Sequence, residues 1–325
     1  MLNVNDTAIL AQAAVLAGKG PNGGKSLLES GYVEVGVDDG WQDPSGVDGS
    51  FHDSAGNPLI NKARFPDLPG MVQKAKAMGV NIGWYHNNCY DSGNEKKAWA
   101  GTPPNGGNVD KDVALIVNAG ITGLKIDGCG PAHNITVWGE AIAAAPYNIT
   151  VENCGDNHLT WTPPDVSTVS GHCPFSLYRV SSDIAPQFLS TMYNLQQRAL
   201  YTDAIHPGCW AYPDMSQVGN TVCNSKYCGG LSVLESRTHF AAWCVSSAPI
   251  VLGFDMTNKT AYDSVYPIIS NAAAISINQA WNGDPGHVVA NSTTSFDAHC
   301  LHGAGATRGD TYSLPTWQVW AKKLD

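Results

Sequence analysis

Residues 123–129 read Gly-Leu-Lys-Ile-Asp-Gly-Cys, a short apolar segment that ends on an acid and a glycine. Similar β-branched segments recur along the chain, and each is followed by polar residues and then by a helical pattern. These predicted strands span residues 32–37, 80–85, 123–126, 147–151, 177–181 and 248–253, with a less obvious one near 208–210. Strands that alternate with helices are typical of parallel βαβ units. So many repeats predict an α/β fold, a (β/α)8 TIM barrel.

A doubly wound sheet is the competing α/β architecture, but no glycine-rich dinucleotide fingerprint follows the first predicted strand. The predicted helices span residues 8–17, 68–78, 110–118, 185–201, 231–245 and 264–277. After residue 280 the helical pattern gives way to short strand-like runs at 287–289 and 317–320. We therefore expect a catalytic barrel over residues 1–280 and the beginning of a C-terminal antiparallel β domain over 281–325.

The composition excludes several function classes. The 325 residues hold 43% hydrophobic and 14% charged residues, the reverse of a disordered chain. The formal net charge is −10 and no basic run occurs, so nucleic acid is not an expected partner. No apolar stretch is long enough for a membrane span.

Nine cysteines and five Asn-x-Ser/Thr sequons indicate the secretory pathway, outside the cell or in a lysosome- or vacuole-like compartment. The candidate glycosylation sites are Asn5, Asn134, Asn148, Asn258 and Asn291. The first residues lack the basic start of a signal peptide, so we expect a mature form or a fragment.

Acidic residues follow most of the predicted strands. They are Asp38, Asp39, Asp127, Glu152, Asp183, Asp214 and Asp255. In a barrel the carboxyl ends of the strands converge on one face, where catalysis takes place. Helix capping is the alternative for Asp255 and for one of Asp38 and Asp39, because aspartate also caps helices.

Two of these acids have a cation close in sequence. Lys125 and Asp127 lie two residues apart and point to the same side of a strand, and Arg179 precedes Asp183 by four residues. Two carboxyl groups from different strands, one ionised and one protonated, are the groups that hydrolyse glycosides. A structural ion pair is the alternative for Lys125 and Asp127. The histidines lack metal-ligand spacing, so we predict no metal and no cofactor.

The chain resembles the melibiases of glycoside hydrolase family 27, which include α-galactosidases. The matching stretches, in family order, are residues 32–41, 81–85, 123–129, 179–184, 213–220, 239–243 and 248–256. The family fold is a (β/α)8 barrel followed by an antiparallel β domain. Its members remove terminal α-galactose with retention of configuration, so galactose-containing glycans or oligosaccharides are the expected partners.

The resemblance implies a role for each matching residue. It implies that Asp127 is the nucleophile and Asp183 the acid/base. Asp38 and Asp39 match residues that hold the sugar hydroxyls. Further substrate contacts are implied for Tyr85, Lys125, Arg179 and Asp214, and an active-site disulfide for Cys89 and Cys129. Retention predicts carboxyl groups about 5–5.5 Å apart.

The chain departs from the family in three places. It begins after the first family strand and ends within the β domain, so we expect a longer polypeptide, or another chain or segment that completes the barrel. Glu152 to Asp156 replaces a segment that bears on the sugar 2-position. Cys154 with Cys173, and Cys223 with Cys228, are further disulfide candidates, although sequence cannot establish connectivity. The alternatives are an enzyme for α-N-acetylgalactosamine or β-L-arabinopyranose, and a non-catalytic carbohydrate-binding or structural glycoprotein.

Overall fold

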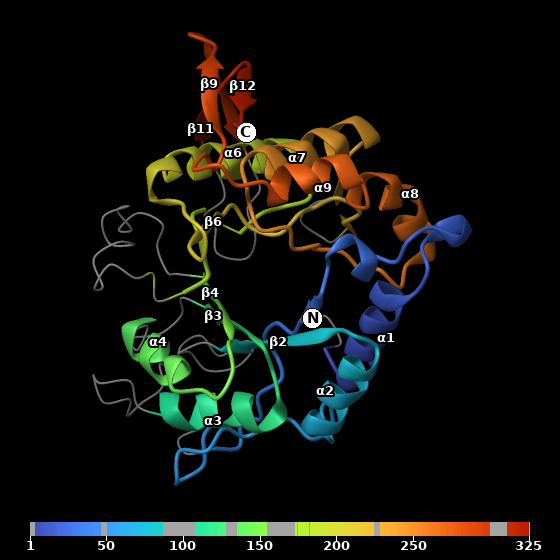
Figure 1. The fold of residues 1–325 in the computed structure, drawn as a ribbon, viewed down its shortest axis with the longest axis vertical. Helices are drawn as coiled ribbons and strands as arrows, with labels where there is room; N and C mark the ends of the chain where they lie inside the picture. Colours follow the sequence, from blue (N-terminus) through green and yellow to red (C-terminus); the bar gives the residue numbers. More distant parts are fainter. Residues whose placement is uncertain are drawn as a thin grey trace. The chain divides into compact units, whose positions relative to one another are not determined.

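The computed structural model describes residues 4–46, 51–86, 108–127, 135–154, 173, 175–181, 183–223, 228–299 and 311–324. The chain forms two compact units (Figure 1). Unit 1 combines Met1–Lys19, Ser26–Asn157 and Thr168–Ser176, and unit 2 combines Gly20–Lys25, His158–Ser167 and Leu177–Asp325.

Unit 1 alternates helices and parallel strands. Its elements are α1 (Asp6–Ala17), β1 (Glu34–Gly36), α2 (Leu68–Ala77), β2 (Asn81–His86), α3 (Val109–Ala119), β3 (Gly123–Asp127), α4 (Ile135–Ala143) and β4 (Thr150–Cys154), with a 3-10 turn at Leu28–Ser30. The four strands pair in parallel in chain order. The predicted strands over 32–37, 80–85 and 123–126 are therefore confirmed, whereas β4 begins three residues later than the predicted strand over 147–151 and includes Glu152. Helix α4 was not predicted.

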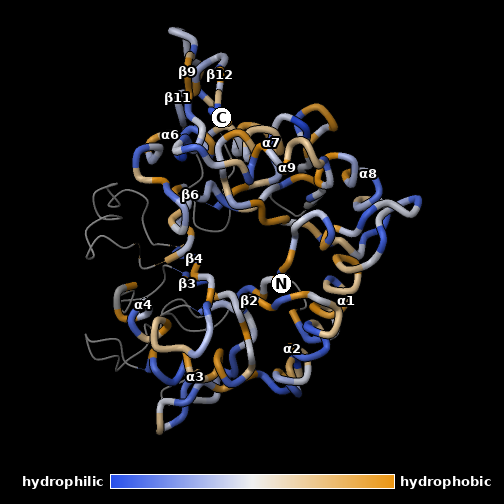
Figure 2. The backbone as a smooth tube through the Cα atoms, in the orientation of Figure 1, coloured by the Kyte–Doolittle hydropathy of each residue, from blue (hydrophilic) through white to orange (hydrophobic). Residues whose placement is uncertain are grey.

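Helix α2 illustrates why these segments fold locally as they do. The Asp67 side chain accepts a hydrogen bond from the Gly70 amide at 3.0 Å, which caps the helix. Leu68, Met71 and Ala75 recur at helical spacing and are buried. In Figure 2 hydrophilic and hydrophobic stretches alternate along α2, as expected for a helix that buries one face.

Aromatic side chains fill the core of unit 1 next to β2. Trp41 packs on Trp84 with ring centroids 5.2 Å apart and on the His86 ring at 5.1 Å. Phe51 packs edge-on against Trp41, and Trp138 of α4 lies 5.3 Å from His86. This cluster supports the strand end from which Tyr85 projects.

Unit 2 contains helices, two parallel strands and several antiparallel ribbons. Its elements are β5 (Leu177–Arg179), α6 (Phe188–Ala199), β6 (Trp210–Tyr212), β7 (Thr221–Cys223), β8 (Cys228–Gly230), α7 (Val233–Val245), α8 (Lys259–Ile269), α9 (Ala272–Gln279), β9 (His287–Asn291), β10 (Ser295–His299), β11 (Thr311–Pro315) and β12 (Gln318–Ala321), with 3-10 turns at Pro21–Gly23 and Thr202–Ala204. Strands β5 and β6 pair in parallel. The pairs β7 with β8, β9 with β12, and β10 with β11 are antiparallel.

Two details of unit 2 differ from the sequence prediction. The predicted strand over 248–253 is reduced to a single parallel bridge between Ser216 and Leu252. The predicted helix over 264–277 is two helices, because the Asn271 side chain accepts a hydrogen bond from the Ala274 amide at 3.0 Å and begins α9.

Candidate active site

A first group of polar residues, called here the Lys125 cluster, lies at the strand ends of unit 1. It consists of Asp38, Tyr85, Lys125 and Asp127. Tyr85 of β2 is in register with Lys125 of β3, so both side chains lie on one face of the sheet. Asp127 projects from the same face because it lies two residues beyond Lys125.

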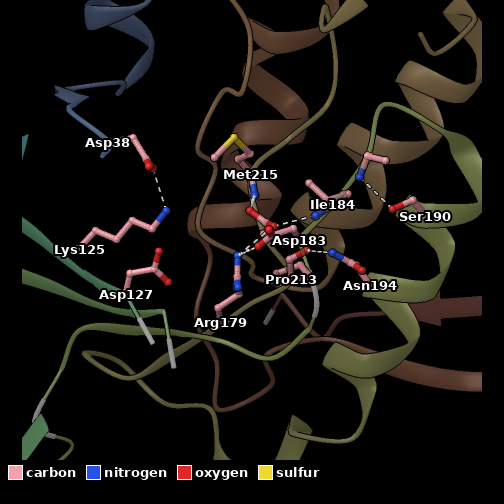
Figure 3. Close-up of polar contacts among 12 residues, drawn as sticks. Asp38, Lys125, Asp127, Arg179, Asp183, Ile184, Ser190, Asn194, Pro213 and Met215 are labelled. Carbon is pink, nitrogen blue, oxygen red and sulfur yellow. Dashed lines mark hydrogen bonds and ion pairs between the residues drawn. The ribbon is translucent and has the colours of Figure 1, made fainter. Parts of the chain in front are cut away.

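The Lys125 ammonium group is the positive centre of this cluster. Its Nζ donates to Asp38 Oδ2 at 2.8 Å (Figure 3). Burial by itself disfavours the charged form, but the acidic groups of Cys154, Asp38, Glu152 and Asp127 outweigh burial and raise the pKa of Lys125 well above its usual value. Lys125 therefore remains a cation at neutral pH.

The Asp127 carboxylate is held by a neutral donor. The Tyr85 hydroxyl donates to Asp127 Oδ2 at 2.7 Å, and the Lys125 ammonium lies 5.4 Å from the centre of the Tyr85 ring. Because Tyr85 stands on a buried strand, this hydrogen bond fixes the rotamer of Asp127.

The segment after β1 is tied to the end of β2. The indole of Trp41 donates to the Tyr85 carbonyl oxygen at 2.7 Å, and Trp41 is fully buried. The Asp39 amide donates to Asp38 Oδ1 at 2.8 Å. The stretch that carries Asp38 and Asp39 is thus anchored to the end of β2 beside Tyr85.

Glu34 on β1 and Glu152 on β4 share the face of the Lys125 cluster but were not predicted as site residues. Glu152 pairs in register with Lys125. Glu34 extends over two glycines: a Cβ at Gly83 or Gly123 would lie 2.7 or 2.4 Å from Glu34 Oε1. Burial raises the pKa of Glu34. The two-residue spacing of Glu34, Gly36 and Asp38 was the available signal, because alternate strand residues share a face.

A second group, called here the Arg179 cluster, lies in unit 2 and consists of Arg179, Asp183 and Asp214. The Arg179 Nη1 atom contacts the Asp183 carboxylate and lies 3.5 Å from Asp214 Oδ2 (Figure 3). The Asp183 side chain is 47% exposed, whereas that of Asp214 is 7% exposed. Asp183 is therefore the carboxyl group of this cluster that a molecule from solvent can reach.

The disulfide candidates need one correction. Cys154 carries a buried thiol, so the proposed pairing of Cys154 with Cys173 is wrong. Cys154 is in register with Asp127, and its sulfur therefore projects on the face of the Lys125 cluster. Cys173 and Cys209 each take part in a disulfide bond, and Cys209 was not among the candidates.

The remaining cysteine and glycosylation candidates stay predictions. Cys223 and Cys228 are direct register partners of an antiparallel pair. Cys89, Cys129 and Asn134 lie outside the described residues. Asn148, Asn258 and Asn291 are exposed, and Asn5 is partly buried at the start of α1.

Asp255, for which capping was the alternative, serves a local turn. Its Oδ1 accepts the Thr257 amide at 2.9 Å and the Thr257 hydroxyl at 2.6 Å. Among the described residues, no group of three or more His, Cys, Asp or Glu could hold a metal ion. Within the same residues, no helix has the length and apolar character that a membrane span requires.

Parallel β/α units with charged side chains at the ends of their strands are typical of β/α-barrel proteins, whose functional residues lie at the carboxyl ends of the strands. The chain belongs to the melibiase family, because the family model described as alpha galactosidase A matches residues 22–280. This membership confirms the resemblance to the melibiases that the sequence motifs indicated.

Individual relatives agree with the family. An alpha-galactosidase from Oryza sativa is 27% identical over 85% of this chain and 60% of its own length. An alpha-N-acetylgalactosaminidase from Rattus norvegicus is 28% identical over 82% of this chain and 61% of its own length. This chain thus spans about three fifths of either relative.

The fold is similar to that of solved structures. Alpha-galactosidase I from Mortierella vinacea superposes with a TM-score of 0.72 at 21% identity, over 91% of this chain and 74% of that protein. The predicted fold class, a (β/α)8 barrel with C-terminal antiparallel strands, is confirmed.

Proposed function

We propose that the chain is the catalytic part of a retaining glycoside hydrolase that removes terminal α-linked galactose. The observation that carries the proposal is the Asp127 carboxylate, oriented by the Tyr85 hydroxyl at 2.7 Å beside the Lys125 cation. Family membership and the exposed Asp183 carboxyl group support it.

In the proposed reaction Asp127 attacks the anomeric carbon as the bond to the leaving oxygen breaks, and Asp183 gives its proton to that oxygen. A glycosyl ester of Asp127 results. Asp183 then removes a proton from water, the water oxygen attacks the anomeric carbon as its bond to Asp127 breaks, and galactose leaves with its original configuration. Lys125 and Asp38 would bind sugar hydroxyls, for which their charged groups are strong hydrogen-bond partners.

The test is hydrolysis of p-nitrophenyl α-galactoside, with the anomer of the released sugar followed by NMR. We expect α-galactose as the first product, and D127N should abolish turnover while leaving the folded spectrum unchanged. The matched control is D110N, which changes an exposed aspartate in the first turn of α3. Near-normal turnover by D127N would remove Asp127 from its role.

The same assay separates the alternatives. The relatives include both an alpha-galactosidase and an alpha-N-acetylgalactosaminidase at similar identity. Hydrolysis of an α-N-acetylgalactosaminide and of a β-L-arabinopyranoside is therefore measured in parallel. Binding of galactose by a folded preparation without turnover of any of these substrates would favour a non-catalytic carbohydrate-binding protein.

We also propose that the protein passes through the secretory pathway and acts outside the cell or in a lysosome- or vacuole-like compartment. The disulfide-bonded Cys173 and Cys209 and the exposed sequons at Asn148, Asn258 and Asn291 support this location.

A further inference from the structure

Asp214 matches a family stretch and was predicted as a substrate contact, yet its carboxylate is directed at the protein. Its Oδ1 accepts the Met215 amide at 2.6 Å. Its Oδ2 accepts the Ile184 amide at 2.9 Å and faces Arg179 Nη1 at 3.5 Å (Figure 3). Both carboxylate oxygens are therefore engaged within unit 2, and the side chain is 7% exposed.

The backbone of Asp214 is held in an unusual conformation. Its φ is +80°, in the left-handed region that residues other than glycine rarely adopt. Such a conformation is unfavourable for a residue with a Cβ and persists where surrounding contacts impose it. The fully buried Trp243 donates from Nε1 to the Asp214 carbonyl oxygen at 2.9 Å. On the preceding residue, Asn194 Nδ2 donates to the Pro213 carbonyl oxygen at 3.0 Å.

The neighbouring His239 holds Trp243 in place. The His239 ring packs on it with centroids 4.0 Å apart, and His239 Nε2 accepts the Gln217 amide at 2.9 Å. Both side chains stand on α7 and are fully buried. A rigid helix therefore determines where the Asp214 carboxylate lies.

The contacts of Asp214 converge on Asp183. Ile184, whose amide it binds, directly follows Asp183 in the chain, and Arg179 contacts both carboxylates. We propose that Asp214, held in place by Trp243, is a positioning residue that fixes the carboxyl group of Asp183 for proton transfer. The inference rests on the proposed role of Asp183 as acid/base and replaces the predicted substrate contact of Asp214.

A misplaced acid has a recognisable kinetic consequence. When the bond from the anomeric carbon to the leaving oxygen breaks, an alkoxide needs the proton of Asp183, whereas p-nitrophenolate leaves without it. A displacement of about 1 Å costs up to about 100-fold where positioning matters. Loss of positioning should therefore slow methyl α-galactoside far more than p-nitrophenyl α-galactoside.

The experiment compares kcat/KM on these two substrates for the wild type, D214N and W243F. Asparagine tolerates the left-handed backbone but cannot offer two carboxylate oxygens. Phenylalanine keeps an aromatic ring at position 243 but lacks the indole N–H. We expect kcat/KM on p-nitrophenyl α-galactoside divided by kcat/KM on methyl α-galactoside to rise about 10-fold or more in D214N. The rise should be smaller in W243F. Inhibition by free galactose, which has no leaving group, should be unchanged in both.

The matched control is W138F. Trp138 is also buried, but its indole nitrogen has no hydrogen-bond partner among the described residues. The ratio should not move in this variant. An equal loss on both substrates in D214N, or weakened galactose inhibition, would overturn the proposal, because those results indicate a general structural role or a sugar contact.

Amide hydrogen exchange provides a readout that does not need activity. D214N should accelerate exchange at Ile184 and leave α6 unchanged. If the wild-type protein hydrolyses neither galactoside, the proposed function fails, and the exchange result then decides the positioning role separately. Unchanged exchange at Ile184 in folded D214N would overturn it.

Discussion

The Lys125 cluster and the Arg179 cluster use the same groups, a cation beside two carboxylates, but support them differently. In the Lys125 cluster Tyr85, Lys125 and Asp127 stand on paired parallel strands, and Asp127 accepts a hydrogen bond from the Tyr85 hydroxyl. In the Arg179 cluster Asp183 lies after β5 outside regular secondary structure, it contacts Arg179, and the amide of the next residue, Ile184, donates to Asp214. The Asp127 carboxylate is thus oriented by regular secondary structure, and the Asp183 carboxylate by a network of polar contacts.

The largest expected effect tests the charge of the Lys125 cluster. K125M leaves the carboxylates of Asp38, Asp127 and Glu152 without the cation that they surround. We expect kcat/KM to fall by roughly 10²–10³-fold, the scale for losing one preorganised electrostatic partner. The measurement is steady-state kinetics on p-nitrophenyl α-galactoside, with the exposed K111M on α3 as control.

If K125M were to retain activity within a few-fold of the wild type, Lys125 would be a structural ion pair. The cation of the Lys125 cluster would then have no role in catalysis, and the two clusters would not be alike in function.

A smaller effect is expected at the neutral hydrogen bond. Y85F removes the hydroxyl that donates to Asp127 but keeps the ring beside Lys125. We expect a loss of about tenfold in kcat, equivalent to about 1.4 kcal/mol. Since Tyr85 acts on the nucleophile, the loss should be similar for good and poor leaving groups, unlike that of D214N. If Y85F showed the same dependence on the leaving group as D214N, the assignment of Tyr85 to the nucleophile and of Asp214 to the acid/base would be contradicted.

The smallest expected effect is on the pH dependence of stability and concerns the buried His86 and His239. Burial lowers the pKa of His86 to about 4, with Asp112 opposing the shift and His52 adding to it, and burial lowers the pKa of His239 to about 3. The unfolded chain has an ordinary histidine pKa near 6.5. Between these values the unfolded state binds more protons, so stability falls as the pH drops from 6.5 toward 4.

His86 allows this acid sensitivity to be tested cleanly, because neither ring nitrogen has a hydrogen-bond partner among the described residues. H86F should change the free energy of unfolding little at pH 7. Below pH 6.5 it should remove a loss of about 1 kcal/mol per pH unit. Urea unfolding at pH 7, 6 and 5 measures this, with the exposed His206→Gln as control. An H86F difference that is constant with pH would contradict the burial argument.

His239 provides the contrast within unit 2. Its Nε2 accepts the Gln217 amide, so H239F would leave a buried donor unpaired. His239 thus takes part in a buried hydrogen bond, whereas His86 is packed among aromatic rings.

Much of the first cluster could be predicted from the sequence, because local rules describe it. The spacing of Lys125 and Asp127 gives a shared face on any strand, and acids after apolar runs indicate strand ends. Glu152 was recognised as a strand-end acid, but its place opposite Lys125 depends on the register between β3 and β4. Sequence spacing within one strand carries no information about that register.

The second cluster was less predictable. Arg179 and Asp183 follow from their spacing, but nothing local indicates that Asp214 has a left-handed backbone or that Trp243 donates to it. The Cys154 pairing failed for the same reason, since disulfide geometry depends on distances between strands and loops. The boundary between α8 and α9 was missed although Asn271 carried a capping signal.

By its sequence alone the chain specifies apolar strands, the acids that follow them and the membership of a family, because side-chain periodicity and motif order are properties of neighbouring residues. The partners of each acid arise from strand register and from helix α7 packing against a strained turn. These contacts join residues far apart in the chain, and their free energies depend on distances that exist once the chain has folded.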